Sequence, residues 1–507
     1  MRWRKRVTDT ISEDWRRSVT SAVLQLGRKG EFGGYPPRKT LITVAWFLLL
    51  GSGVFLVHRG GDGTRASGAR DGAATDVFTP PLGGLAGPPI PTATGDIFEV
   101  PDKSEAATRK IAKPREPHQP LEDARKSMCP FYKALATLDK SDSLSHKSVR
   151  ILHYGDSILT TDELSGRVRS QLQKRFGDGG HGFVLLGKPW RWYRHKDVAL
   201  GARGEWKVRS LTSSPSRDGI WGLGGVTFDT THHRARSWVG ADPDGERGKR
   251  VASFDISYLT QPAGGSMDVF IDGELVETIS TRQEYRGVTH KVFNVTPGPS
   301  KLAVKARGDG KVRVFGAVME SDRPGVVYDA LAINGVRASN FLRFDEHHFA
   351  EELRHREANL VVMMLGANEG ANDSLALGAY RRNLTAVLQR IRRAVPHSGC
   401  LVVGPLDQAQ RGVDGLLVSK RMPRKLTRLQ RKISQDTGCA FFDTFSAMGG
   451  DGSMPRWFRR GLVGGDFIHP TEQGAKMVGS WLTEALLAGY ENFLFNGEQC
   501  ESNVTSL

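Results

Sequence analysis

The chain has 507 residues, of which 39% are hydrophobic and 8% aromatic. This composition excludes a wholly disordered chain and leaves room for two folded domains with extensions. The net charge of +16 invites a nucleic-acid interpretation, but the basic residues are spread along the chain and no RNA-binding aromatic motif accompanies them. We therefore expect no nucleic-acid partner. A membrane surface or an anionic polymer is the better expectation.

The amino-terminal region predicts a membrane anchor. Residues 1–39 carry ten Lys or Arg against four Asp or Glu, which fits either a solvated basic tail or a helix lying on a membrane. Thr40–Val57 is an uncharged run of 18 residues, just long enough to cross a bilayer. Because the basic excess lies on its amino side, we expect a signal anchor with a cytoplasmic amino terminus and the rest of the chain outside.

The four cysteines have no CxxC spacing, so we expect no zinc site. Cys400 and Cys439 each lead into an apolar run, which fits simple burial. A link between Cys129 and Cys500 would join the two ends of the folded region, but the spacing does not establish any pairing.

The stretch Val149–Gly182 organises the folded region. An apolar strand, Val149–Tyr154, ends at Gly155-Asp156-Ser157, and a helical pattern and a glycine loop follow. This geometry lifts a nucleophilic hydroxyl to the edge of an α/β sheet. A serine in such a turn is more often only a helix N-cap, so the rest of the chain must decide its role.

Two kinds of pattern follow this stretch. Alternating apolar runs separated by turn signals predict an inserted β-sandwich of jelly-roll type, and such an insert can bind carbohydrate or can only support or gate the main domain. Its runs are Val251–Leu259, Met267–Ile271, His290–Val295, Lys301–Ala306 and Val312–Val318. From about Gly325 strands alternate with helices again, which predicts a doubly wound parallel sheet with its site at the carboxyl ends of the strands.

A general base for Ser157 is predicted in the loop before the last helix, which reads Asp466-Phe467-Ile468-His469-Pro470. A serine hydroxyl needs a base, and that base needs an orienting carboxylate. Asp466 can bind Nδ1 of His469 and leave Nε2 to face Ser157. A lone DxxH is more often a simple helix entry.

Gly335 and Asn368 follow two other predicted strands at the same edge. Acyl transfer builds negative charge on the carbonyl oxygen, and donors aimed at that charge stabilise it. The backbone N–H groups of Ser157 and Gly335 and the amide of Asn368 are the predicted oxyanion hole. Taken singly, Gly335 is a turn glycine and Asn368 a turn or capping residue.

The ordered set of GDS, a strand-end glycine, GxN and DxxHP resembles the SGNH (GDSL-like) hydrolase superfamily. The resemblance covers residues 121–190 and 326–495, and its signature residues match Ser157, Gly335, Asn368 and His469, with Asp466 as the acid of the triad. It implies a three-layer α/β hydrolase that needs neither a metal nor an organic cofactor.

A narrower similarity rests on Arg175–Phe183, the β insert, Glu369 in GANE and Phe445–Gly450. Together these look like the periplasmic peptidoglycan O-acetylesterase branch, in which a carbohydrate-binding-like β module interrupts the hydrolase. The expected organisation in chain order is a basic cytoplasmic tail, a transmembrane anchor, a flexible Pro/Gly-rich linker, the first hydrolase part, the inserted β-sandwich, the second hydrolase part and a tail. The corresponding residues are 1–39, 40–57, 58–120, 121–190, 191–325, 326–495 and 496–507.

Other candidate residues keep two interpretations each. His181, in the glycine loop, could be taken as a rival base or a metal ligand, but no nearby His, Asp or Glu set completes a metal site, and we expect its loop to shape the rim of the cleft. Trp190, Trp192 and Tyr193 fit sugar stacking or anchoring of the insert equally well.

These patterns together predict a single-pass protein of the bacterial inner membrane with a periplasmic serine esterase, which removes O-acetyl groups from a cell-wall glycan, expected to be peptidoglycan. The same triad can transfer acyl groups between glycans if the cleft excludes water. From a different class, the chain could bind glycan as a scaffold without turnover. The sequence does not identify protein partners or the oligomeric state.

Overall fold

The computed structural model describes residues 116–140, 147–213 and 218–497. The predicted basic tail, membrane anchor and most of the predicted linker lie outside these residues, as do Cys500 and most of the predicted tail. Within the described residues, no helix has the length and apolar character needed to cross a bilayer.

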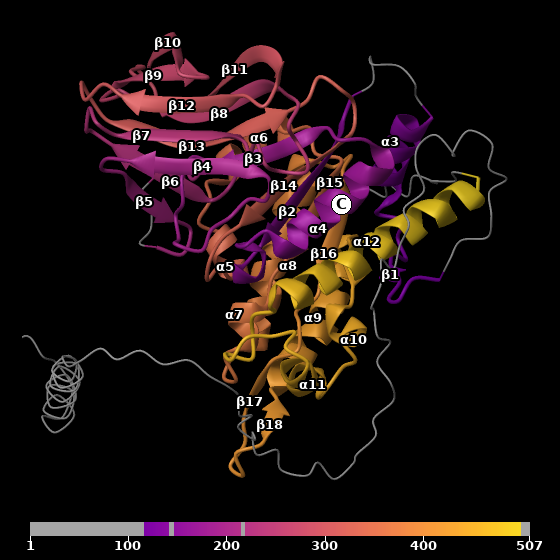
Figure 1. The fold of residues 1–507 in the computed structure, drawn as a ribbon. Helices are drawn as coiled ribbons and strands as arrows, with labels where there is room; N and C mark the ends of the chain where they lie inside the picture. The colour runs from indigo at the N-terminus through magenta and orange to yellow at the C-terminus, as the bar shows by residue number, and fades with distance from the viewer. Residues whose placement is uncertain (1–115, 141–146, 214–217, 498–507) are drawn as a thin grey trace, which may run out of the picture. The chain divides into compact units, whose positions relative to one another are not determined.

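A six-stranded sheet forms the centre of the hydrolase part, with strand order β1-β19-β16-β15-β2-β14 (Figure 1). All its neighbours pair in parallel except β1 and β19. In sheet order the strands are β1 Leu121–Glu122, β19 Ala440–Phe442, β16 Gly399–Val403, β15 Leu360–Met364, β2 Val149–Gly155 and β14 Val326–Ala332. The parallel sheet expected from the sequence is confirmed, and the expected strand Val149–Tyr154 extends by one residue to Gly155.

Helices cover both faces of this sheet. Successive residues of a strand point to opposite faces, so each face packs its own set of strand side chains against its own helices. Ile151 packs in a core with α3, α4 and α12, whereas its neighbour Leu152 packs in a second core with α6, α8 and α9. The α/β architecture predicted from the sequence is therefore confirmed. The helices are α3 Cys129–Asp139, α4 Glu163–Phe176, α5 Ala338–Phe341, α6 Glu346–His355, α7 Ala367–Gly370, α8 Leu377–Ala394, α9 Arg421–Thr437, α10 Thr444–Ala447, α11 Ser453–Arg459 and α12 Glu472–Phe495.

Two antiparallel sheets, β10-β9-β12-β7-β4 and β11-β8-β13-β6-β5, lie in the sequence between the two hydrolase parts. We call strands β4–β13 the β module. They are β4 Val198–Arg203, β5 Lys207–Ser210, β6 Val226–Thr230, β7 Arg236–Ala241, β8 Val251–Thr260, β9 Ser266–Ile271, β10 Glu274–Ser280, β11 Gly287–Gly298, β12 Lys301–Ala306 and β13 Val312–Glu320. Strand β3 (Gly180–Leu185) pairs with β13, so the glycine loop leads directly into the module.

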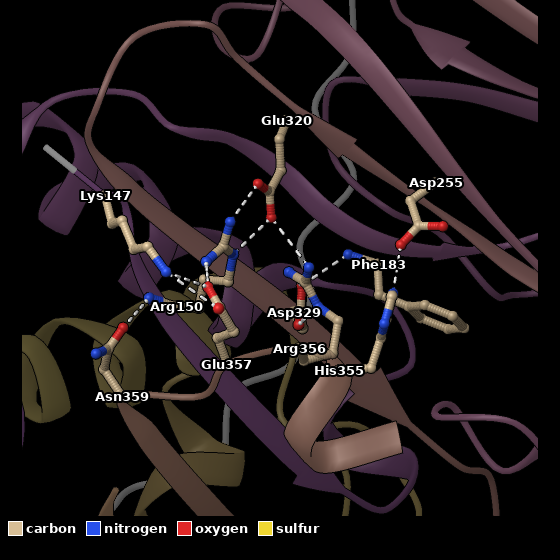
Figure 2. Close-up of polar contacts among 10 residues, drawn as sticks. All are labelled: Lys147, Arg150, Phe183, Asp255, Glu320, Asp329, His355, Arg356, Glu357 and Asn359. Carbon is tan, nitrogen blue, oxygen red and sulfur yellow. Dashed lines mark hydrogen bonds and ion pairs between the residues drawn. The ribbon is translucent and has the colours of Figure 1, made fainter. Parts of the chain in front are cut away.

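Buried ion pairs join the β module to the hydrolase part (Figure 2). Arg356, just after α6, donates to Asp329 in β14 at 2.9 and 3.0 Å and to Glu320, the last residue of β13, at 3.0 Å. Arg150 in β2 donates to the same Glu320 at 2.8 and 2.9 Å. Asp329 also accepts a bond from the backbone N–H of Phe183, so one charged network fixes β2, β3, β13 and β14 together.

One cysteine expectation is corrected. Cys400 and Cys439 are not merely buried but form a disulfide. Cys400 lies in β16, and Cys439 immediately precedes the neighbouring strand β19, so parallel pairing of these strands brings the two sulfur atoms together. The alternative pairing of Cys129 with Cys500 involves a residue outside the described ranges.

Candidate active site

The candidate site lies at the carboxyl end of β2, the strand between β14 and β15. Gly155, the last residue of β2, is the register partner of Ala332 in β14 and of Met364 in β15. The three loops that follow these strands therefore start side by side. They carry Ser157, Gly335 and Asn368, in agreement with the expected placement at one sheet edge.

Ser157 begins a short 3₁₀ helix, Ser157–Leu159, directly after β2. Asp156 caps this helix, because its Oδ1 accepts a hydrogen bond from the backbone N–H of Ile158 at 3.1 Å. The cap belongs to Asp156, so the hydroxyl of Ser157 is free for another partner. That partner is His469, whose Nε2 lies 2.6 Å from Ser157 Oγ.

His469 is oriented by Asp466 in the same loop. Nδ1 of His469 lies 2.6 Å from Oδ2 of Asp466, whose Oδ1 accepts the backbone N–H groups of Ile468 and His469 at 3.1 Å. Burial alone would raise the pKa of Asp466, but the hydrogen bonds from His469 and the backbone outweigh it, and the pKa is lowered. The carboxylate is therefore charged at neutral pH and holds the imidazole with Nε2 toward the serine.

The same loop also starts helix α12, as the alternative interpretation of this motif expects. Helix capping and orientation of the base do not compete, because they use different residues. Thr471 caps α12 by accepting the backbone N–H of Gly474 at 3.4 Å. The imidazole of His469 and the carboxylate of Asp466 remain 43% and 50% exposed. The hydrogen-bond relay formed by Ser157, His469 and Asp466 thus lies at an open rim, where a large substrate can approach it.

Gly335 and Asn368 lie in the loops that follow β14 and β15, and a hydrogen bond joins these two loops. Gly335 has φ +73°, in the left-handed region that favours glycine, and it lies in the turn after β14. Nδ2 of Asn368 donates to the carbonyl oxygen of Val336 at 3.0 Å and so ties its own loop to the Gly335 turn. An amide nitrogen carries two hydrogens, so Asn368 can hold this turn and still donate the second hydrogen to an oxyanion.

Buried polar side chains that the sequence analysis did not identify hold the Asn368 turn in place. The backbone N–H of Ala367 donates to Asp156 at 3.1 Å, and its carbonyl accepts from Gln408 at 2.7 Å. Gln430 donates to the carbonyl of Leu365 at 2.8 Å. No short motif marks these glutamines, because they come from the loop after β16 and from α9, and only the fold brings them to the turn.

Two buried carboxyl groups flank the predicted oxyanion hole. Glu369 accepts the backbone N–H of Ala338, the first residue of α5, at 2.9 Å, and thereby fixes the far side of the Gly335 turn. Burial raises the pKa of Glu369 to about 7 and that of Asp156 to about 6. The glutamate in GANE is therefore a support for the loop, with a carboxyl that takes up a proton close to neutral pH.

The structure also places the remaining sequence candidates. Tyr193 is only 2% exposed and its hydroxyl accepts the backbone N–H of Leu185, which corrects its prediction as a sugar-stacking residue and favours the anchoring alternative. Trp190 packs edge-on against Tyr193 and is partly buried, whereas Trp192 is 50% exposed. His181 is buried against His195 instead of lining a rim, because β3 continues into the β module.

Comparisons with known proteins relate part of the chain to a known family. Residues 296–477 match the model of the GDSL-like Lipase/Acylhydrolase family. This segment contains Gly335, Asn368, Asp466 and His469, while Ser157 lies before it, on the other side of the β module. No curated protein has a significant sequence match to the chain.

Among solved structures, a peptidoglycan O-acetylesterase captured in action is similar, with a TM-score of 0.62 and 21% identity over 73% of this chain and 99% of the other. A salicylyl-acyltransferase from a tetracycline biosynthetic pathway has a TM-score of 0.26 and 13% identity, over 58% and 98% of the two chains. A family two carbohydrate esterase from Clostridium thermocellum has a TM-score of 0.23 and 12% identity, over 52% and 95%. Only the first of these is similar enough to describe the fold.

The family match and the fold lead to one conclusion. Residues 296–477 match the GDSL-like lipase/acylhydrolase family, and the chain is a carboxylic ester hydrolase that resembles the SGNH hydrolases of the peptidoglycan O-acetylesterase branch.

Proposed function

We propose that this protein is a membrane-tethered serine esterase that removes O-acetyl groups from a cell-envelope glycan, with peptidoglycan as the substrate. One observation carries the catalytic part of the proposal. Ser157, His469 and Asp466 form a continuous hydrogen-bond relay with two heavy-atom distances of 2.6 Å, at the carboxyl edge of the parallel sheet.

In the first half of the proposed reaction, Nε2 of His469 takes the hydroxyl proton while Ser157 Oγ attacks the acetyl carbonyl carbon. The new bond moves the carbonyl electron pair onto oxygen. The N–H groups of Ser157 and Gly335 and the amide of Asn368 stabilise this oxyanion. When the carbonyl re-forms, the bond to the sugar oxygen breaks, and that oxygen takes the proton from His469.

In the second half, a water molecule replaces the sugar. His469 removes one proton from the water, and the resulting hydroxide attacks the acetyl-serine carbonyl. Ser157 Oγ leaves with the proton from His469, and acetic acid is released, which ionises to acetate in water. Asp466 keeps its negative charge throughout and stabilises the imidazolium that forms in both halves.

The glycan part of the proposal has separate support. The site lies at an open rim, which suits a polymer better than a deep pocket would, and the similar fold belongs to a peptidoglycan O-acetylesterase. The extracytoplasmic location is proposed from the apolar Thr40–Val57 run. The Cys400–Cys439 disulfide agrees with it, because disulfides persist in oxidising compartments.

Acetate release by the purified full chain tests the substrate. O-acetylated peptidoglycan, acetylated xylan and a small aryl acetate should be compared at equal acetyl content, with Ser157→Ala as the background. A Ser374→Ala variant is the matched control, because Ser374 is exposed in a nearby loop. We expect peptidoglycan to release acetate fastest and Ser374→Ala to match the unaltered chain.

Three other outcomes would change the proposal. Serine-dependent hydrolysis of the aryl acetate alone would keep the esterase and reject peptidoglycan. Movement of acetyl groups to a sugar acceptor in place of release to water would identify a transferase. Binding of polysaccharide with no turnover of any ester by the folded chain would reject the enzymatic account.

A further inference from the structure

Two histidines and two carboxylates form a cluster where the β module meets α6, and none of them belongs to the catalytic motifs. Asp255 comes from β8, His290 from β11 and His355 from the last turn of α6. One potential ligand atom from each of these three residues lies within 4.8 Å of the others. Figure 2 shows the contact between Asp255 and His355, beside the Arg356 network.

The distances in this cluster are of the size that a metal site requires. Nε2 of His355 lies 2.6 Å from one carboxylate oxygen of Asp255, and Nδ1 of His290 lies 3.9 Å from the other. The two imidazole rings face each other with centroids 3.6 Å apart. A tetrahedral zinc ion with bonds of about 2.0–2.1 Å holds its ligand atoms about 3.3 Å apart, so small side-chain rotations would place all three around one ion.

The buried carboxylate of Glu352 is separate evidence for a cation site at this cluster. One of its oxygens lies 3.1 Å from Nε2 of His290, and its other oxygen is buried with no hydrogen-bond partner among the described residues. The whole residue is only 2% exposed. A carboxylate that binds one ring nitrogen of a histidine fixes the tautomer and leaves the other nitrogen as a metal ligand. Glu352 therefore directs Nδ1 of His290 toward Asp255.

The charges at this place favour a bound cation. The arginines on either side of His355 have other partners: Arg356 pairs with Asp329 and Glu320, and Arg354 donates to the carbonyl of Ala394. The carboxylates of Glu352 and Asp255 both lie close to the imidazole of His290, at 3.1 and 3.9 Å. The two carboxylates thus attract a positive charge, which a proton or a metal ion can supply.

We propose that Asp255, His290 and His355 bind one divalent zinc-class cation, with Glu352 as the positioning residue for His290. Two imidazole nitrogens and one carboxylate oxygen suit zinc better than calcium or magnesium, which prefer oxygen ligands alone. The ligands come from both the β module and α6, so the ion clamps the module to the hydrolase. The inference stands independently of the proposed substrate, and it departs from the sequence expectation of no metal site.

Zinc titration by calorimetry tests this site, using the full chain after removal of bound metal with a chelator. We expect one zinc ion per chain for the unaltered protein and at least tenfold weaker binding for Asp255→Asn and for His355→Ala. His347→Ala is the matched control. His347 lies on the same helix and contacts Glu351 at 3.0 Å, but its side chain is 79% exposed and it is outside the cluster. This control should bind zinc as the unaltered chain does.

Two further readouts separate a metal site from a simple ion pair. Zinc should raise the Tm of the unaltered chain and of His347→Ala in a concentration-dependent way, and should leave the Tm of His355→Ala unchanged. Cobalt added in place of zinc should give the strong visible absorption of tetrahedral coordination only when the three ligands are present. The proposal would be overturned if the unaltered chain did not bind zinc. It would also be overturned if Asp255→Asn and His355→Ala bound zinc as tightly as the unaltered chain does.

Discussion

Oδ2 of Asp466 lies 2.6 Å from Nδ1 of His469, three residues further along the same loop. The loop needs no distant element to orient the imidazole, because Asp466 also accepts two backbone N–H groups of this loop. Its own geometry therefore holds His469 with Nε2 toward Ser157.

Asp466→Asn should lower kcat for ester hydrolysis by about 10²–10⁴-fold, because an amide no longer stabilises the imidazolium and permits the wrong tautomer. KM should change little, since Asp466 holds the base and not the substrate. Asp451→Asn is the control, because Asp451 is 51% exposed and pairs with Arg424 away from the relay. An unchanged kcat in Asp466→Asn would remove Asp466 from the triad.

Asn368→Ala should lower kcat by about 10²–10³-fold through loss of one oxyanion donor. The same change breaks the bond to the carbonyl of Val336, so some of the loss will come from movement of the Gly335 turn. Asn368→Asp keeps the size of the side chain but places acceptors where both the oxyanion and the carbonyl of Val336 need donors, so it removes both interactions without opening a cavity. We expect Asn368→Asp to be at least as inactive as Asn368→Ala. Recovery of activity in Asn368→Asp would contradict the oxyanion role.

Glu369 should make the protein less stable as pH rises. Its pKa is about 7 in the folded protein and 4.5 ordinarily, so the folded state binds more protons between these values. The free energy of unfolding therefore falls as pH increases through this window, by about 1–3 kcal/mol from this carboxyl.

Urea unfolding at pH 5 and pH 8 measures this effect. Glu369→Gln keeps an acceptor for the backbone N–H of Ala338 but cannot titrate, so it should lose less stability between the two pH values than the unaltered chain does. Asp373→Asn, at an exposed position four residues later, should behave as the unaltered chain. A Glu369→Gln profile parallel to that of the unaltered chain would show that this carboxyl does not titrate between the two pH values.

Replacing Cys400 and Cys439 by serine together should destabilise the protein by up to about 4 kcal/mol, from the entropy of a loop closed over 39 residues. The disulfide joins β16 to the start of β19, on the side of the sheet away from Ser157 and Gly335. The folded variant should therefore keep its kcat while its Tm falls. An unchanged Tm would show that strand pairing alone holds this edge.

The catalytic motifs were visible in the sequence because each occupies a short segment with a fixed place in an α/β pattern. Ser157 follows an apolar strand, and Asp466 and His469 precede a long helix, so chain order alone predicted that they would meet at one edge. The parallel strands were recognised for a similar reason, since buried strands such as β15 are continuous apolar runs.

Features built from distant residues were not predictable in this way. Strands β4–β7 and β10 were not predicted, because glycines and charged residues interrupt their alternation and only pairing with neighbours defines them. The side chains of Gln408 and Gln430 reach the Asn368 turn from elements that no local pattern connects to it. The Asp255, His290 and His355 cluster has no short spacing. The burial of Tyr193 depends on the path of β3 into the module.

Covalent labelling of the full chain with a sulfonyl fluoride, read by peptide mass spectrometry, tests most directly whether Ser157 is a nucleophile activated by His469. We expect one adduct per chain, on Ser157, with labelling slowed strongly in His469→Ala and absent in Ser157→Ala. An adduct on another residue, or equally fast labelling of Ser157 in His469→Ala, would contradict this expectation.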